Sequence, residues 1–274
     1  YAYSMDSISD NLNDPETGLT IRESPEGTEG PEDFAMVSSG NIYILDSPAN
    51  RIQHYVSGQY KNTIPLPDGE RYLRLKLWGK KLYVLGQNRL LKIDLNSEEF
   101  STISLPEIAN FGAYVVDIVV RSNRLVFVTE TLGNYEYIPP ANPIQKSEVT
   151  YSVSRNGGIS GDTVVIADSG SLWGVPAKDL WITPVGFSSF PSLFVSAIRQ
   201  DLPRDAEGYC SVLEYAKDGT LLNTIPINTS SLKYLPHHFA TLGSDGNLYM
   251  LLIYEDHFTI RTTEFFRTEP SILE

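Results

Sequence analysis

Two stretches near opposite ends of this chain follow the same pattern of residues. Phe34-Ala35 precedes Gly40-Asn41-Ile42-Tyr43, and Phe239-Ala240 precedes Gly246-Asn247-Leu248-Tyr249. The distance from Phe34 to Phe239 is five periods of about 41 residues, and a fixed period of this length is typical of repeat architectures. Each copy is a β-rich segment, a tight turn and a second β-rich segment, which indicates the first hairpin of a propeller blade.

A second marker supports the same period. Segments that begin with Thr-Ile close three of the expected blades, at Thr63-Ile64, Thr102-Ile103 and Thr224-Ile225, separated by one and then three periods of about 40 residues. The sequence therefore predicts an all-β fold, a six-bladed β-propeller of four-stranded antiparallel blades. The blades are expected at 30–66, 67–106, 107–146, 147–186, 187–228 and 229–267.

Composition and spacing agree with a closed β-fold. The chain has 274 residues, of which 11% are aromatic, with 20 Gly and 17 Pro, and this suits strands joined by many turns. No stretch has the sustained apolar spacing of an amphipathic helix, so we expect almost no helix. Long loops are expected at 133–146 and 199–207, and loops of this length often carry function.

The two ends of the chain are expected to lie outside the repeats. Residues 1–18 are polar and low in complexity and predict a flexible N-terminal tether, residues 19–267 form the propeller, and residues 268–274 form a C-terminal tail. Residues 19–23 are expected to be the outer strand of the last blade, paired with 258–264. This pairing would close the ring and remove an open sheet edge.

Charge and cysteine content limit the classes of partner and location. The formal net charge of −13 disfavours nucleic acid, whose phosphates need a basic surface, and no apolar run is long enough for membrane insertion. A single Cys, Cys210, excludes an intrachain disulfide, and we expect a monomer. The chain begins at Tyr1 without an initiator Met or a basic and apolar leader, so we expect that either a signal peptide or an expression tag has been removed. A removed signal peptide predicts an extracellular or cell-surface location.

The first repeat resembles the NHL family. The turn at Gly30-Pro31, the segment 40–44, Asp46 and Asn50-Arg51-Ile52 follow the repeat of that family at nearly every position. The last repeat keeps Gly246-Asn247-Leu248-Tyr249 but lacks the Asp and the Asn-Arg pair, and the middle repeats keep only spacing and polarity. The resemblance implies a six-bladed propeller. It implies no single activity, because the family includes ligases, lyases and binding modules.

Asp46 and Arg51 of this motif have a structural interpretation. We expect a charge-assisted hydrogen bond between them that joins neighbouring strands of one blade. Gly40 and Asn41 are expected to supply the turn conformation, because both tolerate positive φ. These motif residues therefore do not indicate a ligand site.

Candidate binding residues are expected where the inner strands begin, because those ends converge on the central channel. The polar residues at these positions are Glu32, Asp33, Arg74, Asp117, His237 and His238. The two adjacent His residues beside an acidic first blade could bind a divalent metal or exchange protons, and their pKa is expected to be raised by the carboxylates. Flanked by Pro236, they could equally be surface loop residues bonded to the backbone.

A second resemblance is to the gluconolactonase and senescence-marker family of calcium-dependent hydrolases. It rests on Glu29-Gly30-Pro31 and Asn156-Gly157. It implies Glu29 and Asn156 as metal ligands, His237 in place of the family's catalytic Asp, and Ca²⁺ as the cofactor. The chain departs from the family where Pro236-His237-His238 replaces its Pro-Asp-Gly motif, and because Asn156 and His237 lie two blades apart instead of in neighbouring blades.

The sequence predicts a secreted or surface-exposed module that binds a protein or a small-molecule ligand, and it does not specify the function further. This prediction rests on the lack of a complete catalytic set at the channel positions. The chain has no Gly-x-Ser-x-Gly elbow, no phosphate-binding loop and no His-Glu-x-x-His motif. The alternative is a metal-dependent hydrolase, lactonase-like, or a lyase, with its site at the channel mouth.

Overall fold

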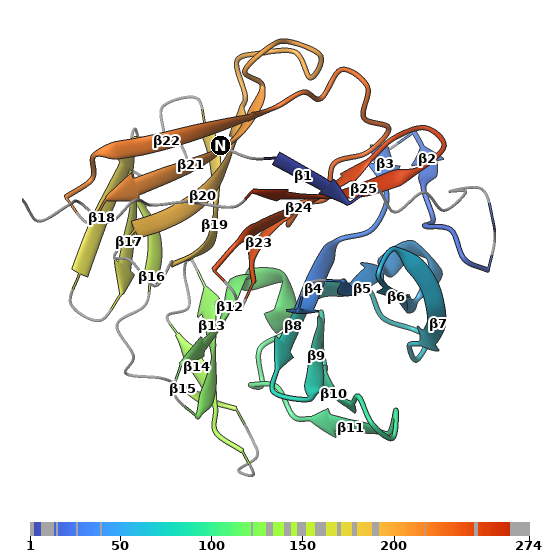
Figure 1. Cartoon of the computed structure of the whole chain (residues 1–274). Coiled ribbons are helices and arrows are strands. Elements are labelled where there is room, and N and C mark those ends of the chain that lie inside the picture. Colours follow the sequence, from blue (N-terminus) through green and yellow to red (C-terminus); the bar gives the residue numbers. More distant parts are fainter. Residues whose placement is uncertain are drawn as a thin grey trace, which may run out of the picture.

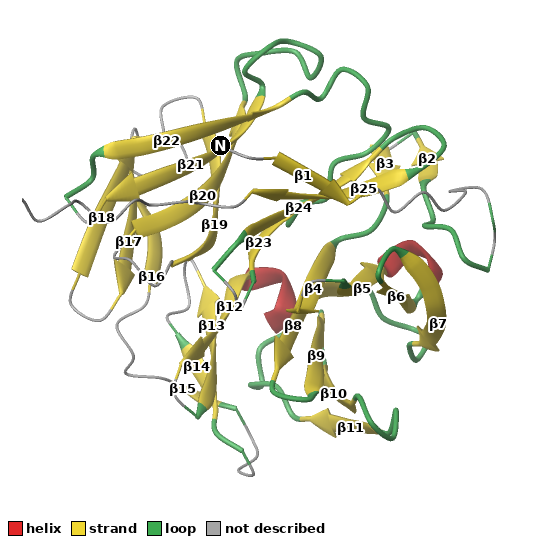
Figure 2. Cartoon of the chain, viewed as in Figure 1, coloured by secondary structure: helices red, strands yellow, loops and turns green. Residues whose placement is uncertain are grey.

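The structure is a computed structural model of the chain. It describes residues 3–6, 14, 16–25, 27–38, 40–121, 123–129, 134–139, 144–146, 152–156, 163–168, 171–176, 180–187, 192–216, 218–243 and 246–263. These residues form antiparallel β-sheets and two short 3-10 helices, η1 (Ser47–Ala49) and η2 (Phe111–Tyr114), with no α-helix among them (Figure 2). The expected scarcity of helix is confirmed for this part of the chain.

Three four-stranded sheets follow one another in the first half of the chain. The first contains β4 (Asp33–Ser38), β5 (Asn41–Asp46), β6 (Arg51–Val56) and β7 (Gln59–Pro65). The second contains β8 (Tyr72–Trp78), β9 (Lys81–Gly86), β10 (Leu90–Asp94) and β11 (Phe100–Ile103). The third contains β12 (Val115–Arg121), β13 (Arg124–Thr129), β14 (Tyr135–Tyr137) and β15 (Gln145–Lys146). All three lie within their predicted spans.

The second half holds one three-stranded and two four-stranded sheets. The three-stranded sheet contains β16 (Ser152–Asn156), β17 (Thr163–Asp168) and β18 (Ser171–Pro176). The next sheet contains β19 (Leu180–Phe187), β20 (Ser192–Arg199), β21 (Cys210–Ala216) and β22 (Leu221–Ile227). The last contains β23 (Ala240–Leu242), β24 (Leu248–Ile253), β25 (Phe258–Thr263) and β1 (Tyr3–Asp6).

The sheets follow one another around a common centre, with β4, β8, β12, β19 and β23 nearest to it (Figure 1). Apolar side chains fill the space between neighbouring sheets. Tyr43 and Leu45 of the first sheet, for example, pack with Leu82 and Val84 of the second. Burial of apolar area between faces, at roughly 25 cal/mol per Å², is the main force that holds such blades together. The fold is therefore a β-propeller of four-stranded antiparallel blades.

The number of blades differs from the prediction. The described residues form five four-stranded blades, so the expectation of six such blades is wrong. The predicted fourth blade, 147–186, contains the three-stranded sheet β16–β18, and the segment expected to complete it is β19, the inner strand of the next blade. Similarly, the stretch 133–146, expected to be a loop, contributes β14 and β15.

The strand that completes the last blade also differs from the prediction. β1, in the stretch expected to be a tether, pairs with β25 in the register Tyr3 opposite Thr263. Residues 19–23 do not make this pairing. Leu19 is buried in the core between the last and first blades, and β2 (Arg22–Ser24) pairs with β3 (Gly27–Glu29). The remaining domain boundaries stay a prediction, and the predicted tail 268–274 lies outside the described residues.

The chain that leads from β1 to the first blade is held by side chains of that blade. The Tyr55 hydroxyl donates to the Thr17 carbonyl oxygen at 2.6 Å, and Gln53 Nε2 donates to the carbonyl oxygens of Glu16 and Gly18 at 3.1 Å. Arg51 donates Nε–H to Asp46 at 2.8 Å, as the motif predicts, and its Nη2 donates to the Gly18 carbonyl at 2.7 Å. The Asp46–Arg51 pair thus holds segment 16–18 as well as the two strands of the blade.

We predict that truncation of residues 1–18 destabilises the protein more than truncation of residues 1–13. Both variants lack β1, but only the longer truncation leaves the buried Gln53 and Tyr55 without their carbonyl acceptors. An unpaired buried polar group costs about 1–3 kcal/mol, which lowers the melting temperature by roughly 2–4 °C per kcal/mol in a domain of this size. Calorimetry of the two variants measures the difference, and equal melting temperatures would contradict the assignment.

Candidate functional site

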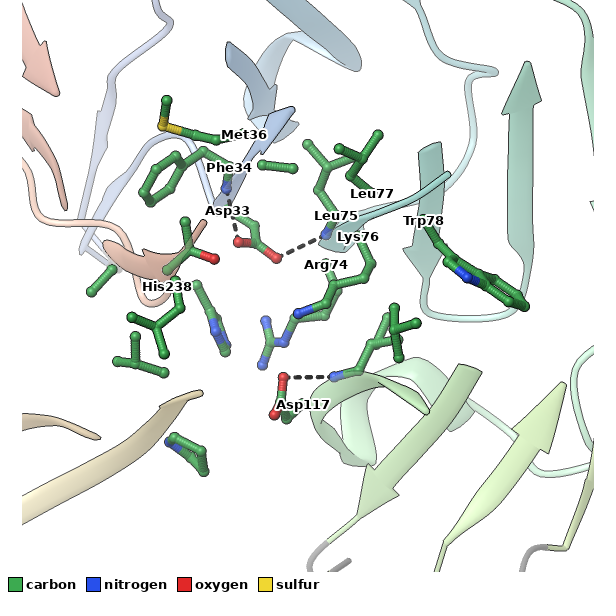
Figure 3. A pocket seen from close by; sticks show the side chains of 18 of the residues that line it. Asp33, Phe34, Met36, Arg74, Leu75, Lys76, Leu77, Trp78, Asp117 and His238 are labelled. Carbon is green, nitrogen blue, oxygen red and sulfur yellow. Dashed lines mark hydrogen bonds between the residues drawn. The ribbon is translucent and has the colours of Figure 1, made fainter. Parts of the chain in front are cut away.

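A cavity of about 350 Å³ lies at the centre of the propeller, between the inner strands of all five four-stranded blades. Its lining comes from β4, β8, β12 and β19, and from β23 with the segment just before it. This volume lies in the range of small-molecule sites, about 300–1,000 Å³. The charged and ionisable side chains that line it are Asp33, Arg74, Lys76, Asp117 and His238 (Figure 3).

Four of these residues hold equivalent places in their blades. Each directly precedes an apolar residue that is buried between blades, and the four pairs are Asp33-Phe34, Arg74-Leu75, Asp117-Ile118 and His238-Phe239. In the strands that hold Asp33, Arg74 and Asp117, neighbouring side chains point to opposite sides, so burying the second residue between blades turns the first toward the channel. His238 lies in the turn just before β23. The repeat therefore brings four residues that are far apart in sequence to one level of the channel.

Asp33 is buried, and both of its carboxylate oxygens accept backbone hydrogen bonds. Oδ1 accepts from the Phe34 N–H of the same strand, and Oδ2 accepts from the Leu75 N–H of β8, each at 2.8 Å. Burial raises the pKa of Asp33 to about 7, although the Leu75 N–H and the positive charge of Arg74 oppose the shift. Asp33 therefore changes charge near neutral pH.

Arg74 points into the space between Asp33, Asp117 and His238 (Figure 3). Its Nη1 donates to its neighbour's carbonyl, Leu73 O, at 2.7 Å, and its Nη2 donates to Val115 O of β12 at 3.3 Å. Nε is buried and has no hydrogen-bond partner among the described residues. Burial lowers the pKa of Arg74, and the charges of Asp33, Glu32 and Asp117 limit the shift. The guanidinium is thus held by two blades inside the cavity.

His238 lines the same cavity and is half-buried. Burial lowers its pKa well below the usual value of 6.5, and the charges of Arg74, His237 and Lys76 lower it further. The expectation that a neighbouring carboxylate raises this pKa is wrong for His238, because desolvation and the cations outweigh the acids. The imidazole is neutral at physiological pH and offers one donor and one acceptor nitrogen.

Two of the predicted channel residues do not line the cavity. Glu32 is buried, and its Oε1 accepts from Arg71 Nη2 at 2.5 Å, while its backbone oxygen accepts from the His238 N–H at 3.3 Å. His237, in the turn before β23, is exposed and does not line the cavity. Of the six predicted residues, the structure brings together Asp33, Arg74, Asp117 and His238, and their role in binding stays a prediction.

The predicted metal ligands do not form a site among the described residues. The Glu29 carboxylate lies 3.7 Å from Arg71, a cation, and the side chain of Asn156 lies outside the described residues. No group of three or more His, Cys, Asp or Glu side chains that could hold a metal occurs in the part of the chain that the structure describes. The calcium site that the hydrolase resemblance implies therefore stays a prediction.

Lys76 and the apolar part of the lining are not among the residues predicted from the sequence. Met36, Leu77, Trp78, Val120 and Leu242 line the cavity farther along the strands. The period-two alternation of strand side chains identifies Lys76, two residues after Arg74, as a second channel residue of β8. The apolar residues have no such marker, because an apolar strand residue reads equally well as part of the core between blades.

Comparisons with known proteins identify the fold. No family model and no curated protein matches the chain. A structural genomics protein of unknown function from Bacteroides thetaiotaomicron has a TM-score of 0.56 and 10% identity, over 96% of this chain and 76% of its own. A putative exported protein from Bacteroides fragilis has a TM-score of 0.54 and 12% identity, over 97% and 95%. Virginiamycin B lyase from Staphylococcus aureus has a TM-score of 0.52 and 13% identity, over 96% and 100%.

At these identities the likeness shows the fold alone, which is that of a β-propeller. It selects neither the NHL family nor the hydrolase family that the sequence resembles. The cavity is therefore the feature that bears on function.

No helix in the described residues is long and apolar enough to cross a membrane.

We predict that Asp33 makes stability depend on pH between about pH 4 and 7. Its pKa is about 7 in the folded protein against 3.8 for an ordinary Asp, so the folded state binds more protons than the unfolded state in this window. The free energy of unfolding of the wild type, minus that of Asp33→Asn, should therefore decrease as the pH rises from 4 to 7. Urea unfolding of both proteins at several pH values measures this difference in free energy of unfolding. A difference that is constant or rises with pH would contradict the assignment.

We also predict that the imidazole of His238 titrates well below pH 6.5, because it is desolvated and lies near Arg74 and Lys76. NMR titration of the four His residues tests this, and the His238→Ala spectrum assigns the resonance. Titration of His238 at or above pH 6.5 would show that the cavity is more hydrated, or less cationic, than described.

Proposed function

We propose that the protein is a binding module that holds a small-molecule ligand in its central cavity. The observation that carries this proposal is the convergence of Asp33, Arg74, Lys76, Asp117 and His238, from four blades, on one cavity of about 350 Å³. Burying a guanidinium and a carboxyl group costs free energy, and a fold that needed only a core would fill the channel with apolar side chains. Such groups are typical of a site that fixes a ligand's orientation.

A substitution that fills the cavity tests this proposal. Val120 lines the apolar part of the cavity and is half-buried, so Val120→Trp should occupy the space of the ligand. The wild type, incubated with a small-molecule extract of its source cells, should retain a compound that mass spectrometry detects. Val120→Trp should retain at least about tenfold less of this compound than the wild type, as expected when binding is weakened by about 1.4 kcal/mol or more.

Leu222→Trp is the matched control. It adds the same ring to an exposed position on the outer strand β22, away from the inner strands. This variant should retain the compound as the wild type does. Equal retention by all three proteins, or retention by none, would contradict a cavity site.

A protein partner is the other occupant that the sequence predicts. Tyr114 and Trp181, which are 45% and 54% exposed, lie where β12 and β19 begin, and a protein bound over the channel mouth would contact such aromatic groups. The cavity favours the small molecule, because its charged groups lie inside the channel. The extracellular or cell-surface location stays a proposal, which antibody labelling of intact cells would test.

A second candidate function is a hydrolase or lyase that acts at the same cavity. It is favoured by the neutral imidazole of His238 together with Asp33, whose pKa is about 7, since an acid and a base with such values can exchange protons at neutral pH. Ca²⁺ is the cofactor proposed for this alternative. Metal analysis of the purified protein and assays with lactones test it. Stoichiometric metal and turnover that His238→Ala abolishes would favour the enzyme over the binding module.

A further inference from the structure

Two cations enter the cavity from one strand. Arg74 and Lys76 lie two residues apart on β8 and therefore on the same side of it, while Leu75 between them is buried in the core between the first two blades. Both line the cavity (Figure 3). Both also lower the pKa of His238, so their charges reach the same point in the channel. Like charges brought together in a partly desolvated space repel each other, and a bound anion would relieve that repulsion.

The acids of the cavity already accept hydrogen bonds from the backbone. Both oxygens of Asp33 accept backbone N–H groups, and Asp117 Oδ1 accepts from the Ile118 N–H at 2.7 Å. The hydrogen-bond donors of the two cations have fewer partners. Within the described residues, the Lys76 ammonium makes no hydrogen bond or ion pair, and Arg74 Nε is buried without a partner. The unpaired hydrogen-bonding groups of the cavity are therefore donors, which a ligand with acceptor atoms would satisfy.

The cavity also has an apolar end. Leu77 and Trp78 of β8, Met36 of β4 and Leu242 of β23 line it farther along their strands than the charged residues do. A strand rises about 3.3 Å per residue, so Trp78, on the same side of β8 as Arg74 and Lys76, lies roughly 7 Å beyond Lys76 and roughly 13 Å beyond Arg74. The lining thus changes from charged to apolar over about the length of a small amphipathic molecule.

From these observations, we propose that the ligand is an amphipathic carboxylate, with its carboxylate on Arg74 and Lys76 and its apolar part against Trp78. This inference rests on the proposed ligand-binding function and specifies its ligand class. A guanidinium presents paired N–H donors that match a carboxylate, and a lysine adds a second positive charge. A ligand with an ammonium head would add a third positive charge beside Arg74 and Lys76, while the carboxylates of the cavity already accept backbone N–H groups. A purely polar ligand would leave the apolar end unfilled.

A series of probes that differ only in the head group tests the proposal. Isothermal titration calorimetry with 4-phenylbutyrate, 4-phenylbutanol and 4-phenylbutylamine compares a carboxylate, an alcohol and an ammonium on the same apolar body. We expect the carboxylate to bind at least about tenfold more tightly than either of the others, since charge-assisted hydrogen bonds contribute about 1.5–3 kcal/mol. Inorganic phosphate, an anion without an apolar part, should bind more weakly than the carboxylate.

Substitutions of the cations assign the head-group site. Lys76→Met keeps most of the side-chain length but removes the charge, and it should weaken binding of 4-phenylbutyrate about fivefold or more while leaving binding of 4-phenylbutanol unchanged. Arg74→Gln should weaken the carboxylate further. Lys80→Met is the matched control, because Lys80 is exposed in the turn after β8 and does not line the cavity. Circular dichroism of each variant checks that it is folded.

The outcomes separate this inference from the proposed function. If the alcohol or the amine binds as tightly as the carboxylate, and Val120→Trp abolishes that binding, the cavity binds ligands but the carboxylate assignment is overturned. The same holds if phosphate binds as tightly as the carboxylate, or if Lys80→Met weakens binding as much as Lys76→Met does. If no probe binds while the wild type still retains a compound that Val120→Trp loses, the carboxylate assignment is overturned and the proposed function stands. If no probe binds and no such compound is retained, the proposed function is contradicted as well.

Discussion

The carboxyl group of Asp33 joins the inner strands of the first two blades. One oxygen accepts the N–H of Phe34 on its own strand, and the other accepts the N–H of Leu75 on the next blade, each at 2.8 Å. Because Arg74 and Lys76 flank Leu75, this one contact also sets the level at which both cations enter the channel. The charge distribution of the cavity thus depends on the alignment of β4 with β8.

The channel combines charges that would be costly if they were buried singly. Burial raises the pKa of Asp33 and lowers that of Arg74, and each residue limits the shift of the other. Partial compensation of this kind lets a fold keep charged groups away from water. It also leaves a cavity whose balance responds to a bound ion and to pH, because Asp33 changes charge close to neutrality.

The internal period of the sequence predicted the hairpins and the strand ends that meet in the channel, so Asp33, Arg74, Asp117 and His238 could be found without a structure. Pairing between distant segments could not be read in this way. The four-residue strand Tyr3–Asp6 lies far in sequence from its partner β25 and carries no repeat motif that identifies the pairing. Leu180–Phe187 fits the end of one predicted blade as well as the start of the next. Side-chain direction separated His237 from His238, and only the structure shows which of two neighbours faces the channel.

The most direct test of the account is a crystal structure of the protein grown with 4-phenylbutyrate. We expect the carboxylate to lie within hydrogen-bond distance of Arg74 and Lys76, with the phenyl ring against Trp78 and the Asp33 contact to Leu75 unchanged. A ligand bound with the opposite orientation, or found outside the channel while the cavity holds only solvent, would contradict it.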